Sequence, residues 1–373
     1  MSNLTTVKRQ PLVPLTTLVA LCAIVTIAVY GSVALGNDSL NRAVALGMVS
    51  LIAVVGLHVF IGNSGVASFG HAAFLAIGAY VTAAVRVPTA TKQAMLPDLP
   101  GPQTTPFLAV LLGGLAAAVV AFTVGLVLMR LNGLAAGLST FALLSIVYVI
   151  ASNTRKVTGG VSGVFGVPQT SNSLTVLPWV LFSILVAWAF AQTRLCLRLR
   201  ASREDEVAAR SIGIDVLWER LGAFTLSAFL TGISGSLMAM YLGSFNPDAF
   251  YLSITLIMLA MLVVGGVTSL SGAVLGAIFV SALRELLRMV ERGVAVGGVT
   301  IPRFEGLQQL GTAVVLLLVL LLRPRGLTEG REILHMGTSS LWRPVRGLVR
   351  RRDEAASRHV DETRSNSDAE AKA

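Results

Sequence analysis

A charged segment between two apolar blocks, residues 200–215, has the residue types needed for a short, self-contained helix. Ser202 could cap the N-terminus of this helix, and Asp205 three residues later would complete a capping box. Arg210 suits the negative end of the helix dipole, and Gly213 suits the left-handed position that follows a helix. The spacing therefore predicts a helix of about ten residues, roughly 15 Å long, with both ends marked.

The predicted helix combines an acidic start with a small-residue surface. The positive end of the helix dipole favours the carboxylates of Glu204, Asp205 and Glu206. Ala208 and Ala209 keep one surface small, so another protein could approach closely. Such a helix could be a rigid lever that docks in a groove of a partner and passes on the partner's motion. The alternative from the residues alone is a helix that rests on a membrane surface.

Two histidines lie inside apolar blocks, where ionisable side chains are rare. His71 follows Ser68 and Gly70 in a segment of small residues. One interpretation is that these three residues line a solute pathway. The other is that His71 is a packed histidine whose N–H groups bond neighbouring carbonyls. His58 allows the same two interpretations.

A glycine-rich stretch, residues 158–166, follows a later apolar block. It is not a phosphate loop, because it does not follow a predicted strand inside a βαβ unit. Glycine permits backbone conformations closed to other residues, so Gly159, Gly160 and Gly163 could shape an irregular loop at the mouth of a pathway. A plain connector is the alternative.

The motifs of common enzyme classes are missing. The sequence has no GxxxxGK[ST] motif, so the chain does not hydrolyse ATP through a P-loop, and it has no HExxH or GxSxG motif. Cys22 lies in the first apolar block and Cys196 near a basic loop, without a set of metal ligands nearby. We expect no catalytic residue, cofactor or metal site.

These segments are embedded in a very apolar chain. Of 373 residues, 54% are hydrophobic and 13% are charged, whereas soluble domains carry about 25% charged residues. The apolar residues come in blocks of about 20, the length at which a helix spans a hydrocarbon core. We expect an all-α polytopic membrane protein with about ten transmembrane helices, of which the third and ninth are the least regular. The expected spans are 13–35, 43–62, 66–86, 107–129, 132–152, 174–192, 221–243, 250–267, 271–290 and 306–322.

Lysine and arginine predict the orientation of the spans. An even number of spans puts both termini on one side, and basic residues mark both ends: Lys8 and Arg9, then Arg323 and Arg325. The loop 193–220 falls on the same side and carries six arginines, so we place it and both termini in the cytoplasm. The net charge of +10 then reflects this rule, not nucleic-acid binding. The residues that oppose it are Arg155, Lys156, Arg284, Arg288 and Arg292.

The sequence divides into an apolar domain, residues 1–327, and a charged tail, residues 328–373. The first apolar block is too long for a signal peptide, so we expect a retained helix. The tail cannot bury a core, and we expect it to be disordered or bound to a surface. Trp342 and the arginines around it could rest on anionic membrane lipid, or the tail could simply be solvated.

Several segments match one group of permeases. Glu206, Ala208, Ala209 and Gly213 are similar to the Glu-Ala-Ala-x-x-x-Gly coupling segment of ABC importer permeases, with Val207 as an extra residue. Further similar segments are Ser64–Phe74 with Ile77–Tyr80, Thr158–Gly163, Gly265–Ala277 and Arg323–Leu327. In these features residues 40–327 resemble the M-type (LivM-like) permeases of branched-chain amino-acid ABC transporters. Val161 and Ser162 depart from the more usual Ser-Asn.

The resemblance implies a permease of the bacterial inner membrane that works beside a second, homologous permease. An external solute-binding protein would deliver a branched-chain amino acid or a similar small polar solute, such as urea or an amide. Two cytoplasmic ATP-binding subunits would bind the coupling loop, and their closure on ATP would switch the pathway. The coupling residues would be Ser202, Glu204, Asp205, Glu206, Ala208, Ala209 and Gly213.

Three other classes remain as alternatives. A passive pore could use residues 64–74 and 265–276 as broken or re-entrant helices, although a pore needs no lever. A secondary transporter would show inverted repeats and charged spans, and neither is evident. A membrane-embedded enzyme would need paired carboxylates or a metal-ligand set.

Overall fold

The computed structural model describes residues 14–95, 103–291, 295–296, 299–300, 306–323 and 326–328. All of them belong to one compact unit, Met1–Arg331. The expectations for Lys8, Arg9, Arg292, Arg325 and the charged tail lie outside these residues and stay predictions.

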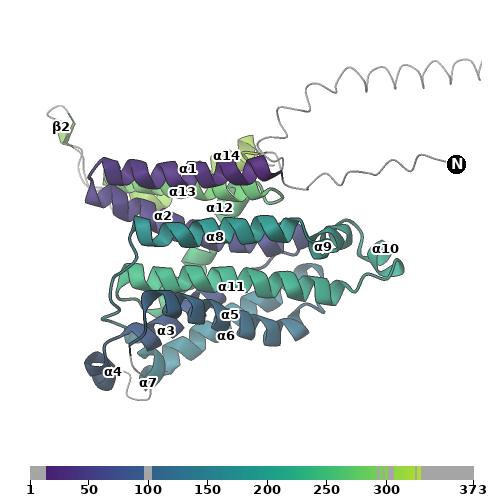
Figure 1. Cartoon of the computed structure of the whole chain (residues 1–373), viewed down its shortest axis with the longest axis horizontal. Helices are drawn as coiled ribbons and strands as arrows, with labels where there is room; N and C mark the ends of the chain where they lie inside the picture. The colour runs from purple at the N-terminus through teal and green to yellow at the C-terminus, as the bar shows by residue number, and fades with distance from the viewer. Residues whose placement is uncertain are drawn as a thin grey trace, which may run out of the picture. The chain divides into compact units, whose positions relative to one another are not determined.

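Helices dominate the described chain (Figure 1). The long ones are α1 (Leu15–Ala34), α2 (Asp38–Leu57), α3 (His71–Arg86), α5 (Pro106–Leu128), α6 (Gly133–Asn153), α8 (Ser173–Ala191), α11 (Val216–Leu242), α12 (Leu252–Gly265), α13 (Leu270–Glu291) and α14 (Leu307–Leu322). The short ones are η1 (His58–Gly62), α4 (Thr89–Met95), α7 (Arg155–Thr158), η2 (Gly160–Ser162), α9 (Arg194–Glu204), α10 (Glu206–Ser211) and η3 (Pro247–Phe250). Two-residue strands, β1 (Ala295–Val296) and β2 (Val299–Thr300), pair antiparallel.

Each of the ten predicted spans coincides with a long helix of the described chain. Among the described residues, eight helical segments are long and apolar enough to cross a membrane, and α3 and the Leu307–Val319 part of α14 are shorter apolar helices. The all-α polytopic membrane fold is thereby confirmed. The third span begins only at His71, because residues 65–70 are not helical. The ninth span, one of the two least clean in the sequence because it is rich in Gly, Ser and Ala, is the continuous helix α13.

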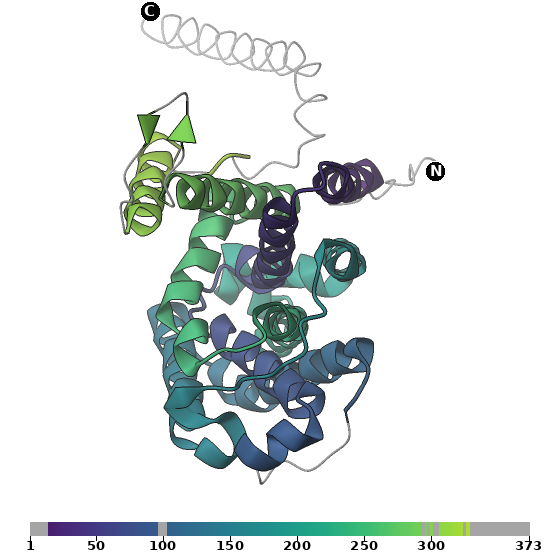
Figure 2. The same ribbon diagram turned by 90° about the vertical axis from the view of Figure 1, so that its left-hand side faces the viewer.

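Two helices form the centre of the bundle. In the apolar windows of α11 and of α2 with η1, 78% of the residues are buried, against 33% in α1, α5 and α6. Figure 2, which turns the view by 90°, shows α11 among helices from both halves of the chain. The remaining spans therefore surround α2 and α11 and leave one side of each helix for lipid or for a partner.

Small residues allow the central helices to approach closely. A Cβ atom on Gly78 of α3 would lie 2.1 Å from the carbonyl oxygen of Gly232 in α11. One on Gly113 of α5 would lie 2.0 Å from the hydroxyl oxygen of Ser236 in α11. Because lipid supplies no hydrophobic drive between helices, such close packing is the main source of their association.

The corner between α12 and α13 holds the end of the described chain. A Cβ atom on Gly265 would lie 1.9 Å from the carbonyl oxygen of Gly272, so the two helices meet at their backbones. The Leu327 amide donates to the Val264 carbonyl at 2.8 Å, and the Thr328 hydroxyl donates to the Gly265 carbonyl at 2.9 Å. Two of the segments that carry the family resemblance thus contact each other.

Candidate functional site

The loop between α8 and α11 contains two helices instead of one. We expected Ser202 to cap a helix, but it does not. It is buried inside α9, and its hydroxyl donates to the Leu199 carbonyl. Asp205 has an extended backbone and is the N-cap of α10, accepting from the amides of Val207 and Ala208 at 2.9 and 3.0 Å. The predicted capping box is therefore wrong, because α9 continues through Ser202 and the break comes at Asp205.

Gly213 lies, as predicted, at the left-handed position that follows the C-terminus of α10. Its φ of +83° is the left-handed conformation that favours glycine. The Gly213 amide donates to the Arg210 carbonyl at 3.0 Å, and the Ile214 amide donates to the Ala209 carbonyl at 3.1 Å. This pair of bonds is a Schellman motif, so the short helix is closed at both ends.

Glu206 connects α10 to two membrane spans. Its Oε2 accepts a hydrogen bond from Arg220 Nη2 in α11 at 2.9 Å. Its Oε1 accepts from Arg210 Nη2 at 2.7 Å and from Asn132 Nδ2, just before α6, at 3.1 Å. Arg220 Nη1 also donates to Asn132 Oδ1, which closes the network. One carboxylate thus joins the loop, α11 and the start of α6.

The network keeps Glu206 ionised. Partial burial alone would raise the pKa of this carboxyl, but hydrogen bonds from Arg210, Arg220 and Asn132 and the charge of Arg220 outweigh it and hold the pKa below its ordinary value of 4.5. The Arg220 side chain is only 6% exposed. Removing one partner of so buried a pair leaves an uncompensated charge, which is costly.

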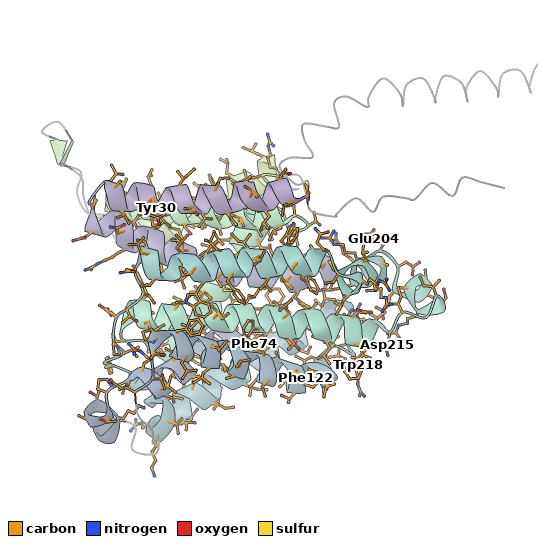
Figure 3. The ribbon with its side chains drawn as sticks, in the orientation of Figure 1. Tyr30, Phe74, Phe122, Glu204, Asp215 and Trp218 are labelled. Atoms are coloured by element: carbon orange, nitrogen blue, oxygen red, sulfur yellow. The ribbon has the colours of Figure 1, made fainter. Side chains whose placement is uncertain are left out.

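The outer surface of α10 carries exposed apolar side chains beside the exposed Arg210. Val207 is 79% exposed and Ile212 is 75% exposed, while Ala208 is exposed between them. Ala209 faces inward and is buried. Figure 3 shows Glu204, Asp215 and Trp218 at this same end of the bundle. Because exposed apolar residues that gather in one patch can mark a protein contact, this surface is the candidate docking face.

Helix α9 attaches to the break that follows α2. Arg203 Nη1 donates to the Gly62 carbonyl at 2.8 Å, and Arg200 Nε donates to Asn63 Oδ1 at 2.8 Å. The Cys196 thiol lies 3.2 Å from the same oxygen. The break itself is a π-helical turn, η1, followed by the irregular residues 65–70. Non-helical backbone at membrane depth is tolerated where protein surrounds it, and π turns occur often at functional sites.

His71 is packed, with both ring nitrogens bonded. The Ser227 hydroxyl donates to the Gly56 carbonyl at 2.6 Å, so it accepts from His71 Nε2 at 2.7 Å. The other nitrogen, Nδ1, then accepts from the Ser68 hydroxyl at 2.8 Å. The rings of Phe60, Phe74 and Phe224 surround the imidazole. The chain of bonds ties the segment before α3 to α11 and α2.

His58 fixes the other side of the same break. Its Nδ1 donates to the Val267 carbonyl, at the corner between α12 and α13, at 3.0 Å. A Cβ atom on Gly62 would lie 2.5 Å from both His58 Nδ1 and this carbonyl oxygen. The break after α2 is therefore held between α9, α11 and the α12–α13 corner.

The glycine-rich stretch lies at the opposite end of the bundle, near α7 (Figure 1). Gly159, Gly160 and Gly163 have φ of +76°, +61° and +79°. A Cβ atom on Gly163 would lie 2.3 Å from the Phe245 carbonyl oxygen. The stretch pairs with the turn after α11, since Val164 and Phe245 exchange backbone hydrogen bonds at 2.9 and 3.0 Å. It is an ordered loop against that turn.

The predicted site residues thus fall into separate places. Five of the seven coupling residues lie on α10 or at its ends, and Ser202 and Glu204 belong to α9. Ser68, Gly70 and His71 lie in the bundle interior, and the three glycines lie at the far end. Sequence reasoning did not single out Arg203 and Arg220 of the loop. It also missed Asn63 and Asn132, which no local spacing connects to the loop. Among the described residues, no three His, Cys, Asp or Glu side chains gather to hold a metal.

Comparison with known proteins identifies related permeases. The chain matches the family described as branched-chain amino acid transport system / permease component over residues 39–322. It is 29% identical over 303 residues to the high-affinity branched-chain amino acid transport system permease protein LivM of Escherichia coli, covering 72% of this chain and 68% of the relative. The LivM protein of Salmonella typhimurium is 28% identical over 302 residues, with the same coverage.

A third relative aligns with a smaller part of the chain. The autoinducer 2 import system permease protein LsrC of Klebsiella pneumoniae is 29% identical over 146 residues, which are 35% of this chain and 42% of the relative. No solved structure matches the chain. The family match covers most of the chain and includes α2 to α14, the coupling loop and both glycine-rich segments. The chain belongs to the family of permease components of branched-chain amino acid transport systems.

Proposed function

We propose that this chain is a permease subunit of an ATP-driven importer in the bacterial inner membrane. Its solute is a branched-chain amino acid or a similar small polar molecule. The chain itself makes and breaks no bonds, and ATP is hydrolysed by two partner subunits that bind the loop of α9 and α10. The relatives that match most of the chain are named as permease proteins of branched-chain amino acid transport, which supports this solute class.

The observation that carries the proposal is the bonding of Glu206. A docking helix can move a span only if it is attached to it, and Glu206 attaches α10 to Arg220 at the start of α11. On its outer side α10 offers Val207, Ala208 and Ile212 to an ATPase subunit. One short helix therefore has a docking face outward and a charged attachment inward.

A second attachment leads to the interior. Arg200 and Arg203 of α9 hold Asn63 and Gly62, directly before the irregular residues 65–70. These residues end at His71, which bonds Ser227 of α11. Movement of α9 and α10 would thus reach both sides of the broken segment, through α11 and through η1. Ser68, Gly70 and His71 then act where the pathway switches, as positioning residues within the packed interior.

The orientation and the partners follow from the basic loop. With six arginines in residues 193–220, the α9–α10 end faces the cytoplasm, as do both termini. The glycine-rich loop of Gly159, Gly160 and Gly163 then faces outside, where a solute-binding protein delivers the solute. A second, homologous permease packs beside this chain, against the span faces that the bundle leaves uncovered.

The test compares Glu206→Gln with Asp38→Asn, an equivalent change in the exposed first turn of α2 at the other end. The assembled importer, with both ATPase subunits and the binding protein, is placed in liposomes. Because a hydrogen bond to a charged group contributes roughly 1.5–3 kcal/mol, leucine uptake by Glu206→Gln should fall about tenfold or more. ATP hydrolysis should continue, and Asp38→Asn should match the wild type. Normal uptake by Glu206→Gln at normal abundance would contradict the coupling assignment.

A further inference from the structure

A cavity of about 180 Å³ lies between α1, α2 and α13, away from the coupling loop. Its lining is apolar apart from Ser281 and Glu285 of α13. The apolar side chains include Val25 and Ala28 of α1 and Leu51 of α2. All three helices are long and apolar enough to span the membrane, so the cavity lies between membrane-spanning segments. An empty apolar void loses dispersion contacts along its walls, and a hydrocarbon chain would restore them.

A smaller polar cavity of about 30 Å³ adjoins the first and shares Ser281 and Glu285 with it. It is also lined by Arg284 and Arg288 of α13 and by Gln308 of α14. The Ser281 hydroxyl is buried there without a hydrogen-bond partner in the described chain. The two cavities together form one site with an apolar half and a charged half.

The charged half has an excess of positive charge. Arg288 pairs with Glu285 at 3.1 Å, and Glu291 accepts hydrogen bonds from the Gly306 and Gln308 amides at the start of α14. Arg284 forms no ion pair within the described residues. Ionisable groups at membrane depth are expensive and mark a function by default.

The order of the two halves along α13 matches an amphiphile. Arg284 lies seven residues before the end of α13 at Glu291, about 10 Å along the axis at 1.5 Å per residue. On α13 the lining of the apolar half begins deeper in the span, at Ile278, and that of the charged half reaches further toward the helix end, to Arg288, whereas on α2 the two halves overlap. The charged half is therefore within reach of the headgroup layer, at the end opposite α9 and α10.

We infer that this site binds one anionic phospholipid of the surrounding membrane. Its phosphate lies against Arg284 and Arg288 with the Ser281 hydroxyl as a further donor, and one acyl chain fills the cavity beside Val25 and Ala28. Arginine suits phosphate because its planar group donates paired hydrogen bonds. A free amino acid fits less well, because the cavity wall is apolar apart from Ser281 and Glu285. The lipid pins α1, a peripheral span, to α2 and α13.

The test counts lipids bound to the full-length chain by native mass spectrometry. Phosphatidylglycerol and phosphatidylcholine with identical acyl chains are titrated separately into protein purified in detergent. We expect one phosphatidylglycerol to bind at least about tenfold more tightly than phosphatidylcholine, because only the former has a net negative headgroup. The double variant Arg284→Gln/Arg288→Gln should lose this preference, and Arg155→Gln, on exposed α7, should keep it.

Matched variants on α1 test the acyl-chain half. Ala28→Leu fills the cavity and should weaken both lipids, whereas Ala23→Leu, on the same helix outside the lining, should weaken neither. Arg284→Lys and Arg288→Lys keep the charges and should retain the preference even if the glutamine variants fold poorly. Equal binding of the two lipids by the wild type, or displacement of phosphatidylglycerol by free leucine, would overturn the lipid assignment.

Discussion

Glu206 Oε2 lies 2.9 Å from Arg220 Nη2, and this pair joins a six-residue surface helix to the most buried part of the bundle. Arg220 is the fifth residue of α11, whose apolar window is 78% buried among the other spans. A force applied to α10 therefore acts directly on a central helix. The neighbouring pair, Arg198 and Glu219 at 3.2 Å, attaches α9 to the same turn of α11.

The C-terminal closure of α10 should be needed for coupling. Gly213→Pro removes the amide that bonds the Arg210 carbonyl and demands a φ near −65° where the chain has +83°. We expect the complex to insert and hydrolyse ATP while uptake falls by about tenfold or more. Gly213→Asn is the control, because asparagine tolerates the left-handed conformation, and it should retain most uptake. If the two variants showed similar uptake, coupling would not depend on the left-handed closure of α10 at Gly213.

The Glu206 network should weaken in acid. The pKa of the folded-state carboxyl lies below 4.5, so its contribution to stability is present above that pH and is lost as pH falls through the lowered value. The melting temperature of the wild type should therefore drop more steeply than that of Glu206→Gln below about pH 4.5. Thermal unfolding of the two proteins between pH 7 and pH 3, measured in the same detergent, checks this. Parallel curves would contradict the network.

The glycine-rich loop should depend on the contact of Gly163 with the turn after α11. Gly163→Ala combines a φ of +79° with a clash 2.3 Å from the Phe245 carbonyl oxygen. Gly133→Ala, at a φ of +57° and with nothing within 4 Å, carries only the conformational penalty of roughly 1 kcal/mol. The melting temperature should fall clearly further for Gly163→Ala. Equal losses would mean that the loop does not pack against the turn.

The bonds of His71 should stabilise the bundle interior. His71→Ala removes the hydrogen-bond partner of the Ser68 hydroxyl and one of the two partners of the Ser227 hydroxyl, and it opens a void among Phe60, Phe74 and Phe224. We expect a loss of roughly 2–4 kcal/mol, measured as a lower melting temperature. Ser227→Ala serves as the comparison. It removes one of the two hydrogen bonds of His71 and should therefore cause part of the same loss of stability. An unchanged melting temperature for His71→Ala would show that the histidine is not a packing residue.

Features that depend on neighbours in the sequence were predictable. Each apolar block became a helix, because a run of about 20 apolar residues can satisfy its backbone in a membrane only in that way. The end of α10 at Gly213 followed from one residue type at one position. The start of α10 could not be predicted in this way, because Ser202 and Asp205 both suit an N-cap. The burial of Cys196 and Leu199 extends α9 through Ser202 and decides between them.

Features that join distant segments were not predictable. Arg220 and Asn132 contact Glu206 from positions 14 and 74 residues away, and no periodicity relates the three. The partners of His71 have the same origin, because Ser227 lies 156 residues further along the chain. A broken helix at residues 64–74 was considered only for a passive pore, and the sequence did not indicate which contacts would hold the break at residues 65–70. Packing of the whole bundle decides such contacts.

The most direct test of the importer assignment is labelled leucine uptake in cells with and without this gene, competed by valine, urea and small amides. Loss of the gene should abolish high-affinity leucine uptake, and valine should compete with leucine in the wild type. Loss of another competitor's own transport instead would keep the importer and change its solute. Unchanged uptake of every solute, in energised cells that express all partner subunits, would contradict the assignment.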